Sequence, residues 1–293
     1  NGRTLTMNNN GGSILVNGTT GGASKSIVST SGTGTIAITN NKSVTSSASG
    51  TLTTDSNVNW ILTGGINFGG VSTVNGILQI NAGGFVTTNA PIYGTGSLLR
   101  YNSAAVPFNR TTEWSASSGA GYPYNVQISN NTTLSPGGTG NTGTALNVAN
   151  NLTIDSGSAI YMDYGANNMT VPLTVNNDLI LSGSLSASGA AGGDIIVRGN
   201  WNKTGSFFPN ARAVFFQGMN AQTFTGATTF DYVLIDKTAG SFTLNNDFTS
   251  NQTLTFTATN TVNITTGSNK VIISNTGSVS RTGLGHVYGN LQK

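Results

Sequence analysis

Apolar and polar residues alternate in short stretches along the chain, and several of these stretches end in a pair of Asn or Asp residues. The frame is apolar, any, apolar, any, Asn, then Asn or Asp. Alternation with a period of two is typical of a half-buried strand. Asn favours a tight turn because it tolerates the left-handed conformation. Each copy therefore predicts a strand that ends in a corner. The copies lie at residues 5–10, 36–41, 126–131, 146–151, 173–178 and 242–247, with a weaker copy at 271–275.

The spacing of these copies indicates the fold class. The closest copies start about 20 to 31 residues apart, and no helical period separates them. Repeats of this length without helices favour a solenoid, whose coils stack at ~4.7–4.9 Å. We expect an all-β fold, a right-handed parallel β-helix of roughly 10–13 coils. A β-sandwich is the alternative, because short strands with Gly-rich turns also describe that fold.

The Asn and Asp residues of the frame are expected to be structural corner residues. In a stacked solenoid, corner Asn residues of neighbouring coils can share side-chain amide hydrogen bonds. Asp178 and Asp247 occupy the same corner position and suggest Ca²⁺ as an alternative. The equivalent residue is Asn in the other four copies, and the Gly-rich calcium nonapeptide is absent. We therefore expect turn formation, no metal and no cofactor. The corner residues are Asn9, Asn40, Asn130, Asn150, Asn177, Asp178, Asn246 and Asp247.

Composition narrows the class of protein further. Charged residues make up 7% of the 293 residues, the formal net charge is +3, and 40 residues are Gly. The 12 basic residues are scattered, so no stripe predicts nucleic-acid binding. Cysteine is absent, which excludes disulfides and thiolate chemistry. No apolar run approaches the ~18 residues of a transmembrane helix. We expect one solenoid domain over residues 1–293, as a fragment of a longer secreted chain.

The repeat is interrupted at residues 101–125, which we expect to form a protruding loop. This segment holds the only Glu, one Trp and three of the eight Tyr residues. Flat aromatic rings beside charged groups suit a glycan platform, since rings stack on sugars and charges bind hydroxyls. The same aromatic residues suit packing onto the solenoid, and we favour packing. The candidate platform residues are Arg110, Glu113, Trp114, Tyr122 and Tyr124.

The carboxylates offer the main route to an enzyme. A glycosidase or lyase on a β-helix needs two acids that face one groove. Asp155 with Asp178, or Asp231 with Asp247, can stack in that way, but no local motif supports catalysis. We expect no enzymatic activity and no catalytic residues.

Three stretches resemble large secreted surface proteins of Bacteroidota, which are similar to β-helical, adhesin-like cargo of the type IX secretion pathway. The resemblance implies an extracellular location on the bacterial cell surface, and it supplies no catalytic residues. The stretches lie at residues 101–134, 199–226 and 277–293.

Together these observations predict a structural or adhesive β-solenoid segment of a secreted bacterial cell-surface protein, such as a stalk, a filament or an adhesin. A carbohydrate-binding or carbohydrate-processing β-helix protein is the alternative. The expected partners are cell-surface glycans or neighbouring subunits and domains of the same protein. Nucleic acid and membrane insertion are not expected.

Overall fold

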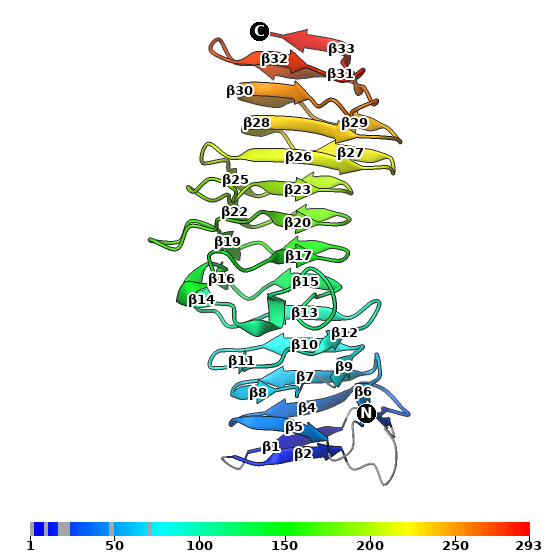
Figure 1. Ribbon diagram of the computed structural model, residues 1–293, viewed down its shortest axis with the longest axis vertical. Coiled ribbons are helices and arrows are strands. Elements are labelled where there is room, and N and C mark those ends of the chain that lie inside the picture. Colours follow the sequence, from blue (N-terminus) through cyan, green and yellow to red (C-terminus); the bar gives the residue numbers. More distant parts are fainter. Residues whose placement is uncertain (1–2, 9–10, 17–23, 47–49, 70–71) are drawn as a thin grey trace. The chain divides into compact units, whose positions relative to one another are not determined.

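The chain contains two compact units, which we describe one at a time. The computed structural model describes residues 3–8, 11–16, 24–46, 50–69 and 72–293. Unit 1 comprises residues 1–134 and 144–149, and unit 2 comprises residues 135–143 and 150–293. In each unit the strands lie on top of one another as successive coils (Figure 1). The expectation of a single domain over residues 1–293 stays a prediction.

Unit 1 contains coils with three sides, and each side forms a parallel sheet. The first side contains β1 (Thr4–Met7), β4 (Gly34–Ile38), β7 (Val58–Leu62), β10 (Ile77–Ile80), β13 (Leu98–Tyr101) and β15 (Asn125–Ile128). The second contains β2 (Ser13–Val16), β5 (Lys42–Ser46), β8 (Gly65–Asn67) and β11 (Phe85–Val86). The third contains β3 (Lys25–Ile27), β6 (Leu52–Thr54), β9 (Ser72–Val74) and β12 (Ile92–Tyr93). The remaining elements of this region are β14 (Phe108–Asn109), η1 (Thr112–Trp114), β16 (Thr133–Ser135) and β17 (Leu146–Val148).

Alternation along the strands builds the core of unit 1. In β7 every second side chain is buried, beginning with Val58 and including Trp60. The strand register places Ile36, Trp60, Leu78 and Leu99 in one interior column. Burial of such apolar side chains contributes roughly 1.5–3 kcal/mol each. Like residues therefore stack on like through successive coils, as the repeat predicts.

Unit 2 repeats this arrangement with two parallel ladders and a third side. The first ladder contains β18 (Leu152–Ile154), β21 (Leu179–Leu181), β24 (Trp201–Lys203), β27 (Gln222–Thr225) and β29 (Phe242–Leu244). The second contains β20 (Leu173–Val175), β23 (Ile195–Val197), β26 (Ala213–Gly218), β28 (Thr228–Lys237), β30 (Phe248–Phe256) and β32 (Ser278–Arg281). The third side contains β19 (Ala159–Tyr161), β22 (Ser184–Ser186) and β25 (Ser206–Phe208). The other elements are η2 (Gly138–Gly140), β31 (Ile264–Ile273) and β33 (Val287–Gln292).

Aromatic rings fill the interior of unit 2. Trp201 is fully buried, and its ring lies 5.2 Å from that of Phe207 and 5.3 Å from that of Phe230. Phe224 is fully buried and stacks on Trp201 at 6.3 Å. Its ring also lies 5.6 Å from that of Phe248. Trp201, Phe224 and Phe248 belong to three successive coils. Ring pairs at these separations are worth about 0.5–1.5 kcal/mol beyond their buried area. The aromatic column thus connects several coils.

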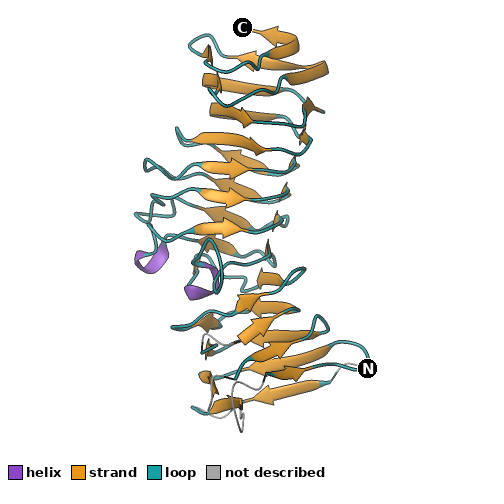
Figure 2. Cartoon of the chain, turned by 45° about the vertical axis from the view of Figure 1, so that its right-hand side comes forward, coloured by secondary structure: helices purple, strands orange, loops and turns teal. Residues whose placement is uncertain are grey.

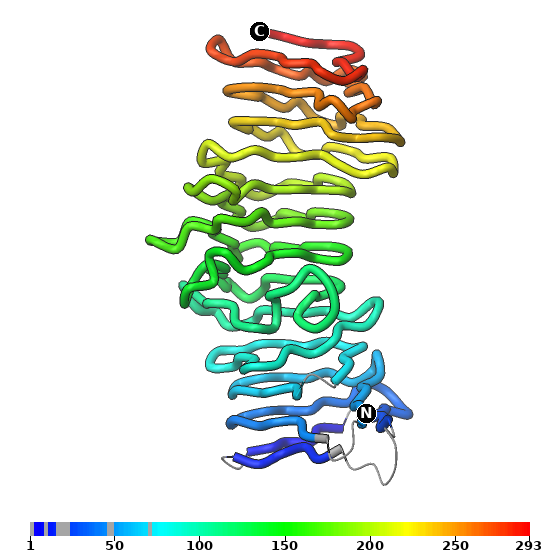
Figure 3. Tube along the Cα trace, viewed as in Figure 1, coloured from blue at the N-terminus to red at the C-terminus, as the bar shows by residue number. Residues whose placement is uncertain are grey.

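These features confirm the expected all-β solenoid. The pairings between named strands described here are parallel, which excludes the antiparallel β-sandwich. The two units together contain about 11 stacked coils, within the expected range. The helical turns in the described part of the chain are short and lie in loops (Figure 2). Figure 3 follows the chain from coil to coil within each unit.

Substitution of Phe224 by Ala tests the aromatic column. Phe224→Ala removes a fully buried ring that contacts four other rings. We expect a loss of about 3–5 kcal/mol in the free energy of unfolding. The matched control is Met219→Ala, because Met219 is 71% exposed; its effect should stay within about 0.5 kcal/mol. Urea denaturation followed by fluorescence measures both, and equal effects would contradict this account of the core.

Candidate functional site

In four of the Asn/Asp pairs, the second residue bonds the following coil. At a corner the backbone leaves the strand ladder, so its N–H groups need other acceptors. The side-chain oxygen of the second residue accepts such an N–H from the next coil. The bonds are Gly65 N to Asn41 Oδ1 at 3.0 Å, Asp178 N to Asn151 Oδ1 at 3.1 Å, Asn200 N to Asp178 Oδ1 at 2.7 Å and Lys270 N to Asp247 Oδ1 at 2.7 Å.

The first residue of the pair bonds the preceding coil. Asn177 donates from Nδ2 to Asn151 Oδ1 at 2.8 Å, which confirms the expected sharing of amides at this corner. Asn40 and Asn130 donate from Nδ2 to backbone carbonyls, those of Asn8 and Asn102 respectively, the latter at 3.5 Å. Asn246 differs, because its Oδ1 accepts from Gly226 N at 2.7 Å. At most of these corners the partner is therefore the backbone rather than a second amide.

This division of roles explains the order of residues in the frame. A donor is needed at the first position in three of the four corners above, and Asp lacks one. Only an acceptor is needed at the second position, and Asn and Asp both provide one. Asn150 contributes its backbone carbonyl, which accepts Asn177 N at 3.1 Å. Asn9 lies outside the described residues.

One corner outside the six copies of the frame has the same bonding to the next coil. Asn200 Oδ1 accepts Thr223 N at 2.8 Å and Thr223 Oγ1 at 2.9 Å. The chain at residues 195–200 follows the same frame, with Gly199 in place of the first Asn. A Cβ at residue 199 would overlap the backbone of Asn177 and lie 2.6 Å from Asp178 Oδ1. Gly at the first position is therefore a signal for a corner that is packed too tightly for a side chain.

Asn151, Asp178 and Asn200 form the longest continuous series of these bonds. Each side-chain oxygen accepts the backbone N–H of the next residue in the series, and Thr223 ends it. We call these residues the Asx ladder. Asp178 takes part through a hydrogen bond to an N–H group, as its Asn neighbours do. Within the described part of the chain no group of three or more acidic or His side chains is arranged to hold a metal ion.

Two substitutions at one corner test these roles. Asp178→Asn keeps the acceptor, and we expect a change of less than about 0.5 kcal/mol in the free energy of unfolding. Asn177→Asp replaces a donor by a second acceptor facing Asn151 Oδ1, and we expect a loss of about 1–3 kcal/mol. Thermal and urea denaturation with and without Ca²⁺ measure both. A stabilisation by Ca²⁺ that Asp178→Asn removes would show a metal site instead.

The candidate catalytic pairs are engaged in similar bonds. Asp231 accepts Ala211 N at 2.7 Å through Oδ2 and Asn251 Nδ2 at 3.2 Å through Oδ1. Asp178 and Asp247 accept backbone N–H groups, as described above. The Asp155 carbonyl accepts Ser158 N at 2.9 Å. These contacts give three of the four acids a structural role, while the expectation of no enzymatic activity stays a prediction.

Three of the five candidate residues of the glycan platform at residues 101–125 are buried. Arg110 and Trp114 are fully buried, and Glu113 is 1% exposed. A buried ring offers no face to a sugar. Trp114 instead donates from Nε1 to the Asn147 carbonyl at 2.7 Å, and its ring lies 6.5 Å from that of Tyr101. The packing interpretation that the sequence also allowed is therefore confirmed for these side chains.

Tyr122 and Tyr124 are half-buried. They flank the buried Pro123, whose carbonyl accepts Ala149 N at 3.0 Å. The exposed parts of the interruption are residues 104, 106–107 and 117–120, and one antiparallel bridge joins Ala120 to Ile92. The loop thus folds back onto unit 1, and two short stretches of it face solvent.

Glu113 is the centre of a buried polar cluster. Its Oε1 accepts Tyr101 Oη at 2.8 Å and Thr111 N at 2.8 Å, and its backbone carbonyl accepts Tyr93 Oη at 2.9 Å. Burial, and next the Glu113 charge, raise the pKa of Tyr93 and of Tyr101 well above 10.0. Both hydroxyls therefore remain donors at neutral pH.

Arg110 attaches this loop to a later segment of unit 1. Its Nη1 donates to the Ala145 carbonyl at 2.7 Å and to the Trp114 carbonyl, and its Nη2 donates to the Thr144 carbonyl at 2.7 Å. Burial lowers the pKa of Arg110 to about 10, against the opposing effect of Tyr101 and Glu113. The guanidinium is charged at neutral pH, and its role is to hold backbone carbonyls in place.

Lys237 is a second buried cation, in unit 2. The residue is fully buried, and its Nζ donates to the Asn220 carbonyl at 2.8 Å. Burial lowers its pKa from 10.5 to about 8. Below pH 8 the Lys237 amine is protonated in both the folded and the unfolded state, so the full cost of burying its charge lowers the stability of the fold. As pH rises above 8 the folded state loses the proton first, and stability rises with pH.

Lys237→Met tests this titration. For the wild type we expect a contribution that raises the free energy of unfolding between pH 8 and 10.5, the interval between its two pKa values. The variant lacks this contribution. From pH 8 to 10.5 the free energy of unfolding of the wild type should therefore rise relative to that of the variant. Urea denaturation at a series of pH values measures it. A difference that does not change with pH would show that Lys237 titrates normally.

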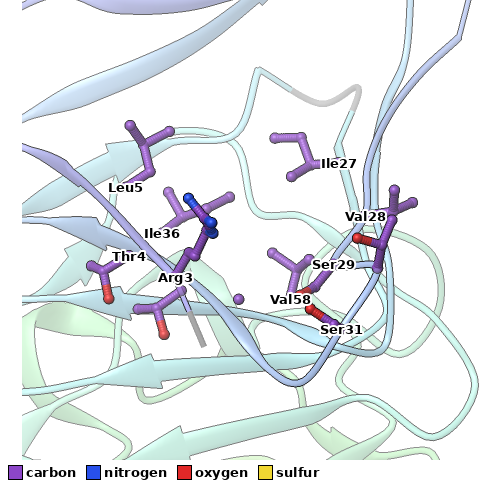
Figure 4. A pocket seen from close by; sticks show the side chains of 12 residues that line it. Arg3, Thr4, Leu5, Ile27, Val28, Ser29, Ser31, Ile36 and Val58 are labelled. Carbon is purple, nitrogen blue, oxygen red and sulfur yellow. The ribbon is translucent and has the colours of Figure 1, made fainter. Parts of the chain in front are cut away.

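An apolar pocket lies at the beginning of unit 1. Its volume is about 320 Å³, and its lining includes Leu5 from β1, Ile27 and Val28 near β3, and Ile36 and Val58 from the next coils (Figure 4). Leu5 and Val28 are each 58% exposed. β1 pairs with β4 and has no second partner among the described strands. Apolar side chains of the first coils of unit 1 are therefore accessible to solvent at this pocket.

Comparison with known proteins finds no matching family model, no matching curated protein and no matching solved structure. The class of protein therefore rests on the fold and the corner geometry, and it is the parallel β-solenoid. The resemblance to secreted Bacteroidota surface proteins stays a prediction. Among the residues that the structure describes, no helix has the length and apolar character needed to cross a membrane.

Proposed function

We propose that the chain is a non-enzymatic structural and adhesive solenoid segment of a secreted bacterial cell-surface protein. The observation that carries the proposal is the Asx ladder, because it commits the polar corner groups to joining coils. The acids Asp178, Asp231 and Asp247 accept backbone N–H groups in the same way. These polar side chains therefore join successive coils of the solenoid.

The surface chemistry supports a role outside the cell. Charged residues make up only 7% of the sequence, and hydroxyl and amide side chains with Gly replace them. Such a surface is hydrated without strong long-range attraction to charged partners. The absence of cysteine means that folding needs no disulfides. These properties suit a spacer exposed to changing ionic conditions.

The end strands support neighbouring domains or subunits as partners. β1 exposes Leu5, and β33 exposes Tyr288 (66%) and Leu291 (52%). An unpaired strand edge accepts another strand by backbone hydrogen bonds. Solenoids require such ends to be capped or extended. Neighbouring domains or subunits of the same protein are therefore the partners we propose at the ends.

Single-molecule pulling tests the structural role. We expect force to release the chain in steps of one or a few coils, since each coil contacts only its neighbours. One coil of roughly 20–25 residues releases about 65–90 Å of extended chain. Asp178→Asn should leave the unfolding force unchanged, and Asn177→Asp should lower it. Extension of the chain at negligible force would contradict the structural role. Cleavage of a polysaccharide by the purified chain, lost in Asp231→Asn, would contradict a non-enzymatic one.

A further inference from the structure

An aromatic groove lies on the third side of unit 2. The strand register aligns Tyr161 of β19, Ser186 of β22 and Phe208 of β25 in one row across three coils. The neighbouring row of Ile160, Leu185 and Phe207 alternates with it, and Ile160 and Leu185 are buried in the core. Ser186 is small, so a gap separates the two rings of the outer row. Neighbouring strands lie ~4.7–4.9 Å apart, which places the two ring-bearing strands about 9.5 Å apart.

The walls of this groove are exposed to solvent. Phe208 is 46% exposed, and Tyr161 and Tyr164 are half-buried. The Tyr161 and Tyr164 rings lie 6.4 Å apart and nearly parallel, with an interplanar angle of 22°. The volume of the groove is about 390 Å³, and its lining is Tyr161, Asp163, Tyr164, Ser186, Phe208 and Asn210. Pockets for small ligands range from ~300 to 1,000 Å³.

Polar groups stand beside the rings in a fixed geometry. Asn210 Nδ2 lies 2.8 Å from each of three acceptors: Asp163 Oδ2, Ser186 Oγ and the Ala187 carbonyl. Asn210 itself lies in a turn at φ 49°, closed by the bond from Arg212 N to the Pro209 carbonyl at 2.8 Å. Among the described residues, Asp163 Oδ1, Asn210 Oδ1 and both tyrosine hydroxyls have no hydrogen-bond partner in the protein. Two fixed acceptors and two hydroxyls are thus available beside apolar faces.

We propose that this groove binds a pyranose ring of a neutral oligosaccharide. A pyranose has apolar C–H faces and a rim of hydroxyls, which matches flat rings bordered by fixed acceptors. Each C–H face packs on a ring at van der Waals separation, ~3.5–4.0 Å. Two such contacts require about 7–8 Å, against about 9.5 Å between the two strands that carry the rings. A purely apolar ligand would leave the carboxylate of Asp163 desolvated without a partner, at a cost.

The oligosaccharide would be the ligand of the adhesive part of the proposed function. The proposal rests on that function only in taking a cell surface as the source of the glycan. The stacked coils position the groove, but the structural role needs no ligand. The two claims therefore have separate readouts, saccharide binding for one and stability under denaturant or force for the other.

The test uses the full chain and a panel of neutral probes: cellohexaose, xylohexaose, mannohexaose and chitohexaose. Saturation-transfer NMR and isothermal titration calorimetry measure binding at millimolar concentrations. We expect at least one probe to bind the wild type. Phe208→Ala and Tyr161→Ala should each weaken it roughly 2- to 10-fold, the range set by ring contacts of about 0.5–1.5 kcal/mol. Asp163→Asn should also weaken it, since a charged acceptor is replaced by an amide.

Controls separate the groove from other aromatic surfaces. Phe208→Tyr keeps a ring at the wall and should retain binding. Tyr288→Ala removes a ring that is 66% exposed outside the groove, and it should change nothing. All variants should keep the wild-type unfolding midpoint. The proposal is overturned if no probe binds, if binding survives Phe208→Ala and Tyr161→Ala together, or if only an apolar dye binds the groove.

Discussion

The bond from a side-chain oxygen of Asn or Asp to a backbone N–H of the next coil is the constraint on which this structure depends. Along the strands, parallel pairing satisfies the backbone without help from side chains. At the corners the chain turns out of the ladder, and an unpaired buried N–H costs about 1–3 kcal/mol. Asn151, Asp178 and Asn200 supply the missing acceptors in successive coils. Corner chemistry therefore decides where the chain can turn and still stack.

Much of this was visible in the sequence because the constraint is local. The alternating frame predicts the strands, its spacing predicts the coils, and the presence of Asn at the second position in four of the six copies argues against a metal. The frame does not show which neighbouring coil each corner residue bonds. Only the three-dimensional register shows that Asn177 reaches back to Asn151 while Asp178 reaches forward to Asn200. Gly199 marks a corner for a different reason, because a neighbouring backbone occupies the space of its side chain.

The sequence was least informative about which aromatic residues are exposed. Trp114, Glu113 and Arg110 have the composition of a binding platform, yet contacts to residues up to 35 positions away bury them in unit 1. Tyr161, Ser186 and Phe208 lie far apart in the chain and share no motif. They form one row only because β19, β22 and β25 pair in register. Exposure is a property of the stacked coils, so composition alone does not show which aromatic rings face solvent.

Corner bonds and strand register belong to one architecture in unit 2. The corner bonds join successive coils, and the register of β19, β22 and β25 aligns Tyr161, Ser186 and Phe208 in one row. Residue-resolved hydrogen exchange of the backbone amides of Asn200 and Thr223 tests the central claim most directly. The account predicts slow exchange at both amides in the wild type, and a selective rise at Asn200 in Asp178→Ala and at Thr223 in Asn200→Ala. Exchange at the rate of an unprotected peptide in the wild type, or no selective rise in these variants, would contradict it.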